Sequence, residues 1–244
     1  MTAVEIAVQD LAGVRTALEE GADRIELCIA LDLGGLTPSI GLVEAAVAAA
    51  AEARVTDFIH VLVRPRGGGF VYDESELTVI ERDIRAVFAA GADGVVVGAA
   101  HADGTLDETA IARFVEASDG MTVTVHRVID AAPDALEALR PLGDLGVTRV
   151  LSSGGAADCR AGASVLERMR TAGAGTVQIM AGGGVRVDDI ALLVAAGVDA
   201  VHLSARGRTD RGGASGPGGG AAGFDVTDRA VVRAAVDAAR AAQG

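Results

Sequence analysis

The sequence predicts an α/β protein built as a single (β/α)8 barrel, with eight parallel strands inside and helices outside. Three observations predict it. A helix-to-strand connector recurs along the chain, apolar runs of strand length alternate with helical patterns, and 244 residues is a common length for such a barrel. Regular alternation of strands and helices favours a parallel sheet.

The connector consists of Gly, a small residue and then Asp or Thr, followed by a β-branched run. Glycine tolerates the left-handed backbone that closes a helix, so each copy predicts a helix end followed by a buried strand. The copies are Gly21-Ala22-Asp23, Gly91-Ala92-Asp93, Gly146-Val147-Thr148 and Gly197-Val198-Asp199.

Taken in order, strands are expected at 4–8, 24–27, 58–63, 94–97, 122–125, 149–151, 177–180 and 200–203. Helical patterns cover 11–20, 41–53, 75–90, 109–118, 134–145, 159–172, 187–196 and 226–242. Eight strand–helix units fit a closed barrel better than a doubly wound sheet. The Gly-x-Gly-x-x-Gly fingerprint of dinucleotide binding does not follow the first strand.

We expect one domain over residues 1–244, with a mobile Gly-rich loop at 206–223. Arg206, Arg208 and Arg211 offer contacts for a lid, although plain mobility is favoured.

The net charge of −13 argues against nucleic acid or an anionic membrane as the main partner. The chain has no apolar run of membrane-spanning length and opens on a strand-like segment rather than a signal peptide. Two cysteines, Cys28 and Cys159, make no disulfide framework, so a reducing cytoplasm is the expected location. A homo-oligomer is compatible with the sequence.

Polar residues gather where the predicted strands end, and the carboxyl ends of the strands form the working face of this fold. These residues are Glu26, Cys28, Arg64, Arg66, His126, Arg127, Asp130, Ser153, Gly154, Gly155, Gly183 and Gly184.

Several phrases together resemble the CutC family, which is named for copper homeostasis. They are ADRIELC at 22–28, GGLTPS at 34–39, VRPRGG at 63–68, GADGVVVG at 91–98, HRVID at 126–130, LSSGG at 151–155, GGGV at 182–185 and HLSAR at 202–206. The resemblance covers roughly residues 4–240. It implies a (β/α)8 barrel and a cytosolic protein that binds or handles copper.

Cu(I) prefers thiolate or thioether ligands, usually at least two. Cys28 is the candidate copper ligand, but Ala7 stands where members of the family often carry a second cysteine in the first strand. Cys159 belongs to a distant part of the ring, and the methionines show no metal-binding spacing. Cys28 could equally be a small apolar filler.

A second hypothesis is an enzyme acting on a small anionic metabolite that carries a carboxylate or phosphate. Arg64, Arg66 and Arg127 would clamp the anion, because the guanidinium fork matches these groups. Alternatively, the arginines pair internally with Glu5, Glu26 or Asp130.

For this enzyme, His126 is the candidate acid or base, and Glu26 or Asp130 is the second carboxylate. Glu26 is expected beside Arg64 or Arg66. Asp130 either orients His126 or caps the next helix.

Two glycine loops offer backbone amides to a phosphate, Ser153-Gly154-Gly155 and Gly183-Gly184, unless they only make tight turns. His60 and His202 are expected as satisfied strand residues, although His202 could reach the mouth, and His101 is expected at the surface. A structural barrel without catalysis remains a third alternative.

Overall fold

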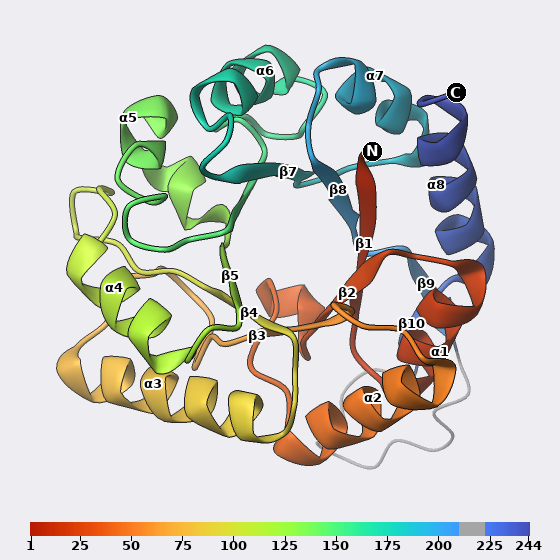
Figure 1. The fold of residues 1–244 in the computed structure, drawn as a ribbon, viewed down its shortest axis with the longest axis horizontal. Coiled ribbons are helices and arrows are strands. Elements are labelled where there is room, and N and C mark those ends of the chain that lie inside the picture. The colour runs from red at the N-terminus through yellow and green to blue at the C-terminus, as the bar shows by residue number, and fades with distance from the viewer. Residues whose placement is uncertain (210–222) are drawn as a thin grey trace.

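Eight parallel strands pair edge to edge into a closed ring, which confirms the predicted fold class (Figure 1). The computed structural model describes residues 1–209 and 223–244. The ring is closed by β8 pairing with β1, where Glu5 lies opposite His202. The strands are β1 Ala3–Val8, β2 Arg24–Leu27, β3 Ile59–Leu62, β4 Gly94–Val97, β5 Thr122–Val125, β6 Arg149–Ser152, β7 Gln178–Gly182 and β8 Ala200–Leu203.

The helices form an outer layer around this ring (Figure 1). They are α1 Leu11–Glu20, α2 Ile40–Ala53, α3 Glu74–Ala89, α4 Glu108–Ala117, α5 Ala135–Leu139, α6 Ala163–Ala172, α7 Ile190–Ala195 and α8 Arg229–Ala241. Three short 3-10 turns follow strands or precede helices, η1 Leu31–Leu33, η2 Arg127–Ala131 and η3 Val187–Asp189.

The helix ends follow from local side-chain chemistry. Asp10 accepts a hydrogen bond from the Gly13 amide at the start of α1, and Gly21 ends that helix in the left-handed conformation at φ 75°. At α3, Asp73 and Glu76 form a capping box, each side chain accepting from the backbone amide of the other.

The aspartates of the recurring connector fasten neighbouring strands at the amino-terminal end of the barrel. Asp23 accepts from the amide of Val4 at 2.7 Å, and Asp199 accepts from the amide of Ile179 at 2.8 Å. Asp93 accepts from the amide of Ile59 at 2.9 Å. Each of these carboxylates satisfies a buried amide in the first or second residue of a strand.

The predicted bounds hold for β2, β4, β5, β8 and α1, and differ by a few residues in most other elements. The largest differences are at α5, which ends at Leu139, and at α6, which begins at Ala163. Before α8 stands a strand that the sequence did not predict, β10 Phe224–Thr227, paired antiparallel with β9 Arg206–Thr209. The start of the predicted mobile loop is therefore a strand, and its centre, 210–222, lies outside the described residues.

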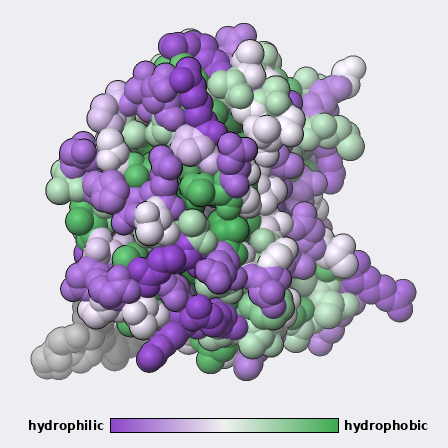
Figure 2. All heavy atoms as spheres, turned by 60° about the vertical axis from the view of Figure 1, so that its left-hand side comes forward, coloured by the Kyte–Doolittle hydropathy of each residue, from purple (hydrophilic) through white to green (hydrophobic). Residues whose placement is uncertain are grey.

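Apolar side chains from the strands and the inward faces of the helices make the largest core, which includes Ile6, Ile25, Phe58 and Phe114. Two small clusters are separate from it: Cys28, Leu62 and Val96 form one, and Leu151, Met180 and Ala200 form the other. Hydrophilic residues predominate on the visible outer face, with smaller hydrophobic areas between them (Figure 2). Across the described residues, every helix is too short or too polar to span a bilayer.

Candidate functional site

A cavity of about 230 Å³ opens at the carboxyl ends of the strands, where the sequence predicted the site. Its apolar wall comes from Leu31, Leu62, Phe70, Leu151, Val185 and Leu203. The remaining lining residues are Glu26, Gly34, Arg64, His126, Arg127, Gly183, Gly184, His202 and Ser204.

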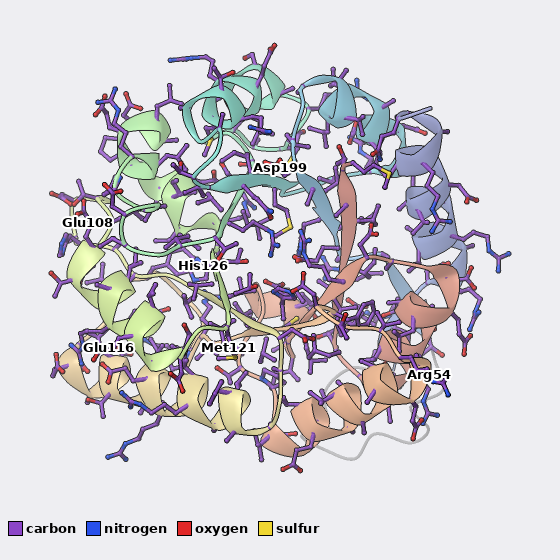
Figure 3. All side chains as sticks on the ribbon, in the orientation of Figure 1. Arg54, Glu108, Glu116, Met121, His126 and Asp199 are labelled. Carbon is purple, nitrogen blue, oxygen red and sulfur yellow. The ribbon has the colours of Figure 1, made fainter. Side chains whose placement is uncertain are left out.

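His126 follows β5 and lies toward the inside of the ring, whereas Glu108 and Glu116 lie on the outer helix α4 (Figure 3). The Val128 amide donates to His126 Nδ1 at 3.2 Å, so the ring proton of the neutral imidazole belongs on Nε2. Among the described residues this buried Nε2 has no hydrogen-bond partner. Burial, aided by the charge of Arg64, lowers the pKa of His126 to about 3.

We predict that the His126 imidazole stays neutral, as the Nε2–H tautomer, from pH 8 down to pH 5. Its pKa lies well below that range, so the proton is gained only in stronger acid. The measurement is the pair of imidazole ¹⁵N chemical shifts followed by NMR across this range. A titration of His126 with a midpoint near pH 6.5 would contradict the prediction.

Arg64 is a buried guanidinium held by backbone carbonyls. Its Nη1 donates to Leu33 at 2.9 Å and to Gly35 at 3.0 Å, and its Nη2 donates to Gly68 at 2.6 Å. None of the ion pairs among the described residues neutralises it, so its charge remains available to a ligand. Arg64 lies 5.1 Å above the Phe70 ring, and the same ring lies 4.6 Å from that of His126.

The other two predicted clamps are already paired. Arg66 forms an ion pair with Glu76 of α3 and lies over the Tyr72 ring at 5.0 Å. Arg127 lines the cavity, but its Nε donates to Asp130 at 2.8 Å and its Nη2 to Ser153 at 3.1 Å. Internal pairing, the alternative reading of the sequence, therefore describes these two arginines.

Asp130 neither contacts His126 nor caps α5, whose cap is Asp134. Its carboxylate accepts from the Ser153 amide at 3.0 Å and from the Gly155 amide at 3.2 Å, together with the Ser152 hydroxyl at 2.6 Å. Asp130 thus accepts from the Ser153 and Gly155 amides, and the Ser152 hydroxyl accepts from the Gly154 amide at 2.8 Å. The amides that were expected to bind an anion are therefore already hydrogen-bonded within the protein.

The second glycine loop does reach the cavity. Gly183 and Gly184 both line it and both have positive φ, 115° and 69°. A Cβ at Gly183 would lie 2.8 Å from the Arg127 guanidinium carbon and would displace that side chain, and the positive φ strains any residue other than glycine here.

On the other side of the ring, Glu26 meets His202 rather than an arginine. His202 Nε2 lies 3.8 Å from a carboxylate oxygen of Glu26, and its Nδ1 lies 2.8 Å from Glu5. The Arg24 Nε in turn donates to Glu5 at 2.6 Å. The sequence named Glu5 as an internal partner of the three clamp arginines, but the structure pairs it with Arg24 instead. Sequence reasoning missed Arg24 and the position of His202 between the two glutamates. The available signal was a second carboxylate inside a buried strand, at Glu5.

In this cluster of Glu5, Arg24, Glu26 and His202, the pKa values of the two carboxyl groups shift in opposite directions. Burial raises the pKa of Glu26, and the charge of Glu5 adds to that effect. For Glu5, burial alone would raise the pKa, but Arg24 and the hydrogen bond with His202 outweigh it and hold the pKa well below its usual range. Burial also opposes protonation of His202, yet Glu5 and Glu26 raise its pKa overall.

The thiol of Cys28 is a poor fit to copper. It is fully buried between Leu62 and Val96, and its Sγ faces the Val8 carbonyl at 3.7 Å. Burial, with the nearby charge of Glu26, raises its pKa, which disfavours the thiolate that binds metal. Within the described part of the chain, no cluster of three or more His, Cys, Asp or Glu side chains could hold a metal ion.

Of the other residues singled out, Cys159 is buried with its Sγ 3.9 Å from the Ser152 carbonyl, and His101 is exposed. His60 is fully buried in β3, but neither of its ring nitrogens has a hydrogen-bond partner among the described residues, so the expectation of a satisfied strand histidine is wrong. Its Nε2 lies 3.4 Å from Asp57, an ion-pair distance only.

The molecule is therefore a (β/α)8 barrel with a small polar cavity at the carboxyl ends of its strands. Comparison with known proteins places it more closely: the CutC family matches residues 2–207, and the chain belongs to that family. A curated relative from Agrobacterium fabrum, named family protein CutC, is 42% identical over 202 residues, covering 82% of this chain and 78% of the relative. One from Rhizobium meliloti with the same name is 44% identical, over 78% of this chain and 76% of its own.

A solved structure from Streptococcus agalactiae, named as a candidate copper homeostasis protein CutC, shares this fold with a TM-score of 0.78 and 28% identity. The match covers 83% of this chain and 98% of that one. A thiamine phosphate pyrophosphorylase from Pyrococcus furiosus has a TM-score of 0.63 at 14% identity over 99% of this chain and 97% of its own, which shows a common fold alone.

Proposed function

We propose that this protein is an enzyme that binds a small anionic metabolite in the cavity at the barrel mouth. The observation that carries the proposal is the pair Arg64 and His126. Among the described residues, the Arg64 guanidinium has no ion-pair partner and the buried His126 Nε2–H has no hydrogen-bond partner. Both groups line the same cavity and lie against the same Phe70 ring. A buried donor left unpaired costs about 1–3 kcal/mol, so a ligand oxygen that accepts from it would recover that energy.

The volume and lining of the cavity support a small ligand with one charged end. About 230 Å³ is below the usual range for drug-sized ligands. The Gly183-Gly184 backbone and Arg64 would supply the polar contacts, while Leu62, Phe70 and Leu203 would form an apolar wall against the rest of the ligand.

The test is direct binding of small anions to the full chain. Inorganic phosphate, pyruvate and phosphoenolpyruvate are titrated by calorimetry, with glycerol as the uncharged control. We expect at least one anion to bind with a Kd below about 1 mM and to bind more weakly as salt rises. Failure of all three anions to bind would contradict the proposal.

Copper handling is the second candidate, favoured by membership of the CutC family and by the name of the Streptococcus agalactiae relative. If this chain handles Cu(I) through Cys28, the purified protein binds Cu(I) stoichiometrically in a competition assay, and Cys28→Ala abolishes the binding. Cys159→Ala is the matched control. The burial of Cys28 leads us to expect no stoichiometric binding by either variant or by the parent.

We also propose a cytoplasmic location for either activity. Both cysteines are free and buried, as expected of a protein kept in a reducing compartment.

A further inference from the structure

The polar side chains that line the cavity come from separate strands of the ring. Glu26 and His202 come from β2 and β8, which flank β1, whereas His126 follows β5, four strands away from β1 in a ring of eight. A ligand that fills the cavity therefore meets a carboxylate–imidazole pair on one side. On the other side it meets the His126 N–H donor. The Arg64 guanidinium follows β3, between β2 and β5 in the strand order, and lies over the Phe70 ring that His126 also contacts.

Two further residues of the buried cluster, Glu5 and Arg24, hold the His202 imidazole in place. His202 Nδ1 is fixed by Glu5 at 2.8 Å, and Glu5 is fixed by Arg24 at 2.6 Å. The other ring nitrogen of His202 stops 3.8 Å short of Glu26, beyond hydrogen-bond distance. Both Glu26 and His202 line the cavity, so Glu26 is positioned beside the space where a ligand would sit.

We propose that Glu26 takes a proton from a carbon atom next to the carbonyl group of the bound anion, while the carbonyl oxygen accepts from His126 Nε2–H beside Arg64. This inference rests on the proposed function and names its substrate class, a small carboxylate or phosphate ester that carries a ketone or aldehyde. The reaction class is enolisation, as in an isomerase or a carbon–carbon lyase.

The step balances without any further reagent. The Glu26 carboxylate forms an O–H bond as the substrate C–H bond breaks, and the electron pair of that bond forms a C=C double bond. The carbonyl π pair moves to oxygen, whose negative charge meets the His126 N–H and the Arg64 cation. Return of the proton from Glu26 to carbon restores the carboxylate.

The chemistry of each group suits its part. A proton abstraction of this kind is favoured by a carboxylate more basic than an ordinary glutamate, and burial makes Glu26 such a base. His126 stays neutral and already uses Nδ1 as an acceptor, so it serves as a hydrogen-bond donor to oxygen rather than as the acid or base that its sequence context suggested.

The experiment measures exchange of carbon-bound hydrogen for deuterium in D2O by ¹H NMR. The probes are pyruvate, 2-oxobutyrate, dihydroxyacetone phosphate and glyceraldehyde 3-phosphate, and the Kd of each is measured alongside. We expect the full chain to exchange the hydrogen next to the carbonyl of at least one bound probe at least 100-fold faster than buffer.

Three variants assign the exchange to the proposed group. Glu26→Gln should lower the rate by about 10²–10⁴-fold with little change in the Kd of the probe, the range typical for loss of a general base. Glu26→Asp should retain part of the rate. The matched control Glu44→Gln, an exposed residue of α2, should leave the rate unchanged.

The outcomes separate this inference from the function on which it rests. Binding of the probes without exchange, or full exchange by Glu26→Gln, overturns the inference and leaves the anion site standing. Binding of no probe, together with no binding of phosphate or phosphoenolpyruvate, overturns both.

Discussion

Replacing Glu5 with Gln is expected to lower the free energy of unfolding at pH 7 by about 3–5 kcal/mol, the cost typical of removing one partner from a buried ion pair. The substitution keeps the shape of the side chain but leaves the Arg24 guanidinium, 6% exposed, without its carboxylate. The measurement is urea unfolding followed by circular dichroism. Glu44→Gln is the control and should change the stability by less than about 0.5 kcal/mol.

The Glu5–Arg24 ion pair also predicts how the difference in unfolding free energy between the parent and Glu5→Gln depends on pH. The folded protein holds the pKa of Glu5 below the unfolded value of about 4.3, so the folded state favours the carboxylate. The stabilisation is therefore fully present above about pH 4.3 and decreases as the pH falls toward the lower folded pKa. Equal stabilities of Glu5→Gln and the parent at pH 7 would show that the pair contributes nothing.

Replacing Arg64 with Met is expected to weaken anion binding by about 10–100-fold, because hydrogen bonds to charged groups are worth about 1.5–3 kcal/mol. Arg66→Met is the matched control. It lies two residues along the same loop and also stacks on an aromatic ring, but its charge is paired with Glu76. Calorimetry with the tightest-binding anion gives both dissociation constants.

Arg64 also holds the carbonyls of Leu33, Gly35 and Gly68, so the melting temperature of each variant must be measured alongside. Equal weakening of binding by Arg66→Met and Arg64→Met, with both variants folded, would contradict the assignment of Arg64 to the ligand.

The scaffold could be predicted because its signals are local. The recurring Gly-x-Asp connector states where a helix ends and a strand begins, and it carries its own carboxylate, as Asp23 and Asp199 show. Alternating apolar runs then supply the strand count. The paired strand β9–β10 escaped prediction because Arg206–Thr209 and Phe224–Thr227 lack the apolar character of buried strands and lie outside the barrel ring.

The sequence predicts several residues that line the cavity, but it does not predict which charged side chains pair with one another. Arg64, His126 and Glu26 all reach the cavity because they lie at or near the carboxyl ends of strands of one barrel, β3, β5 and β2. The ion pairs and hydrogen bonds depend on the directions in which side chains point at the ends of strands that are far apart in the sequence. Asp130 illustrates this limit: its spacing suggested His126, yet it turned to the Ser153 loop, where two backbone amides and a hydroxyl satisfy it better than one imidazole.

The pairing of β8 with β1, which closes the barrel, has to form late in folding. Most strand pairs join neighbours in sequence, so much of the barrel can grow unit by unit at a small entropic cost per step. The last pairing, β8 with β1, joins residues separated by nearly the whole ring, and Glu5 and His202 are 197 positions apart. The cluster of Glu5, His202 and Glu26 therefore assembles only when the barrel closes. A chain in which β8 has not paired with β1 would lack the proposed proton-transfer activity.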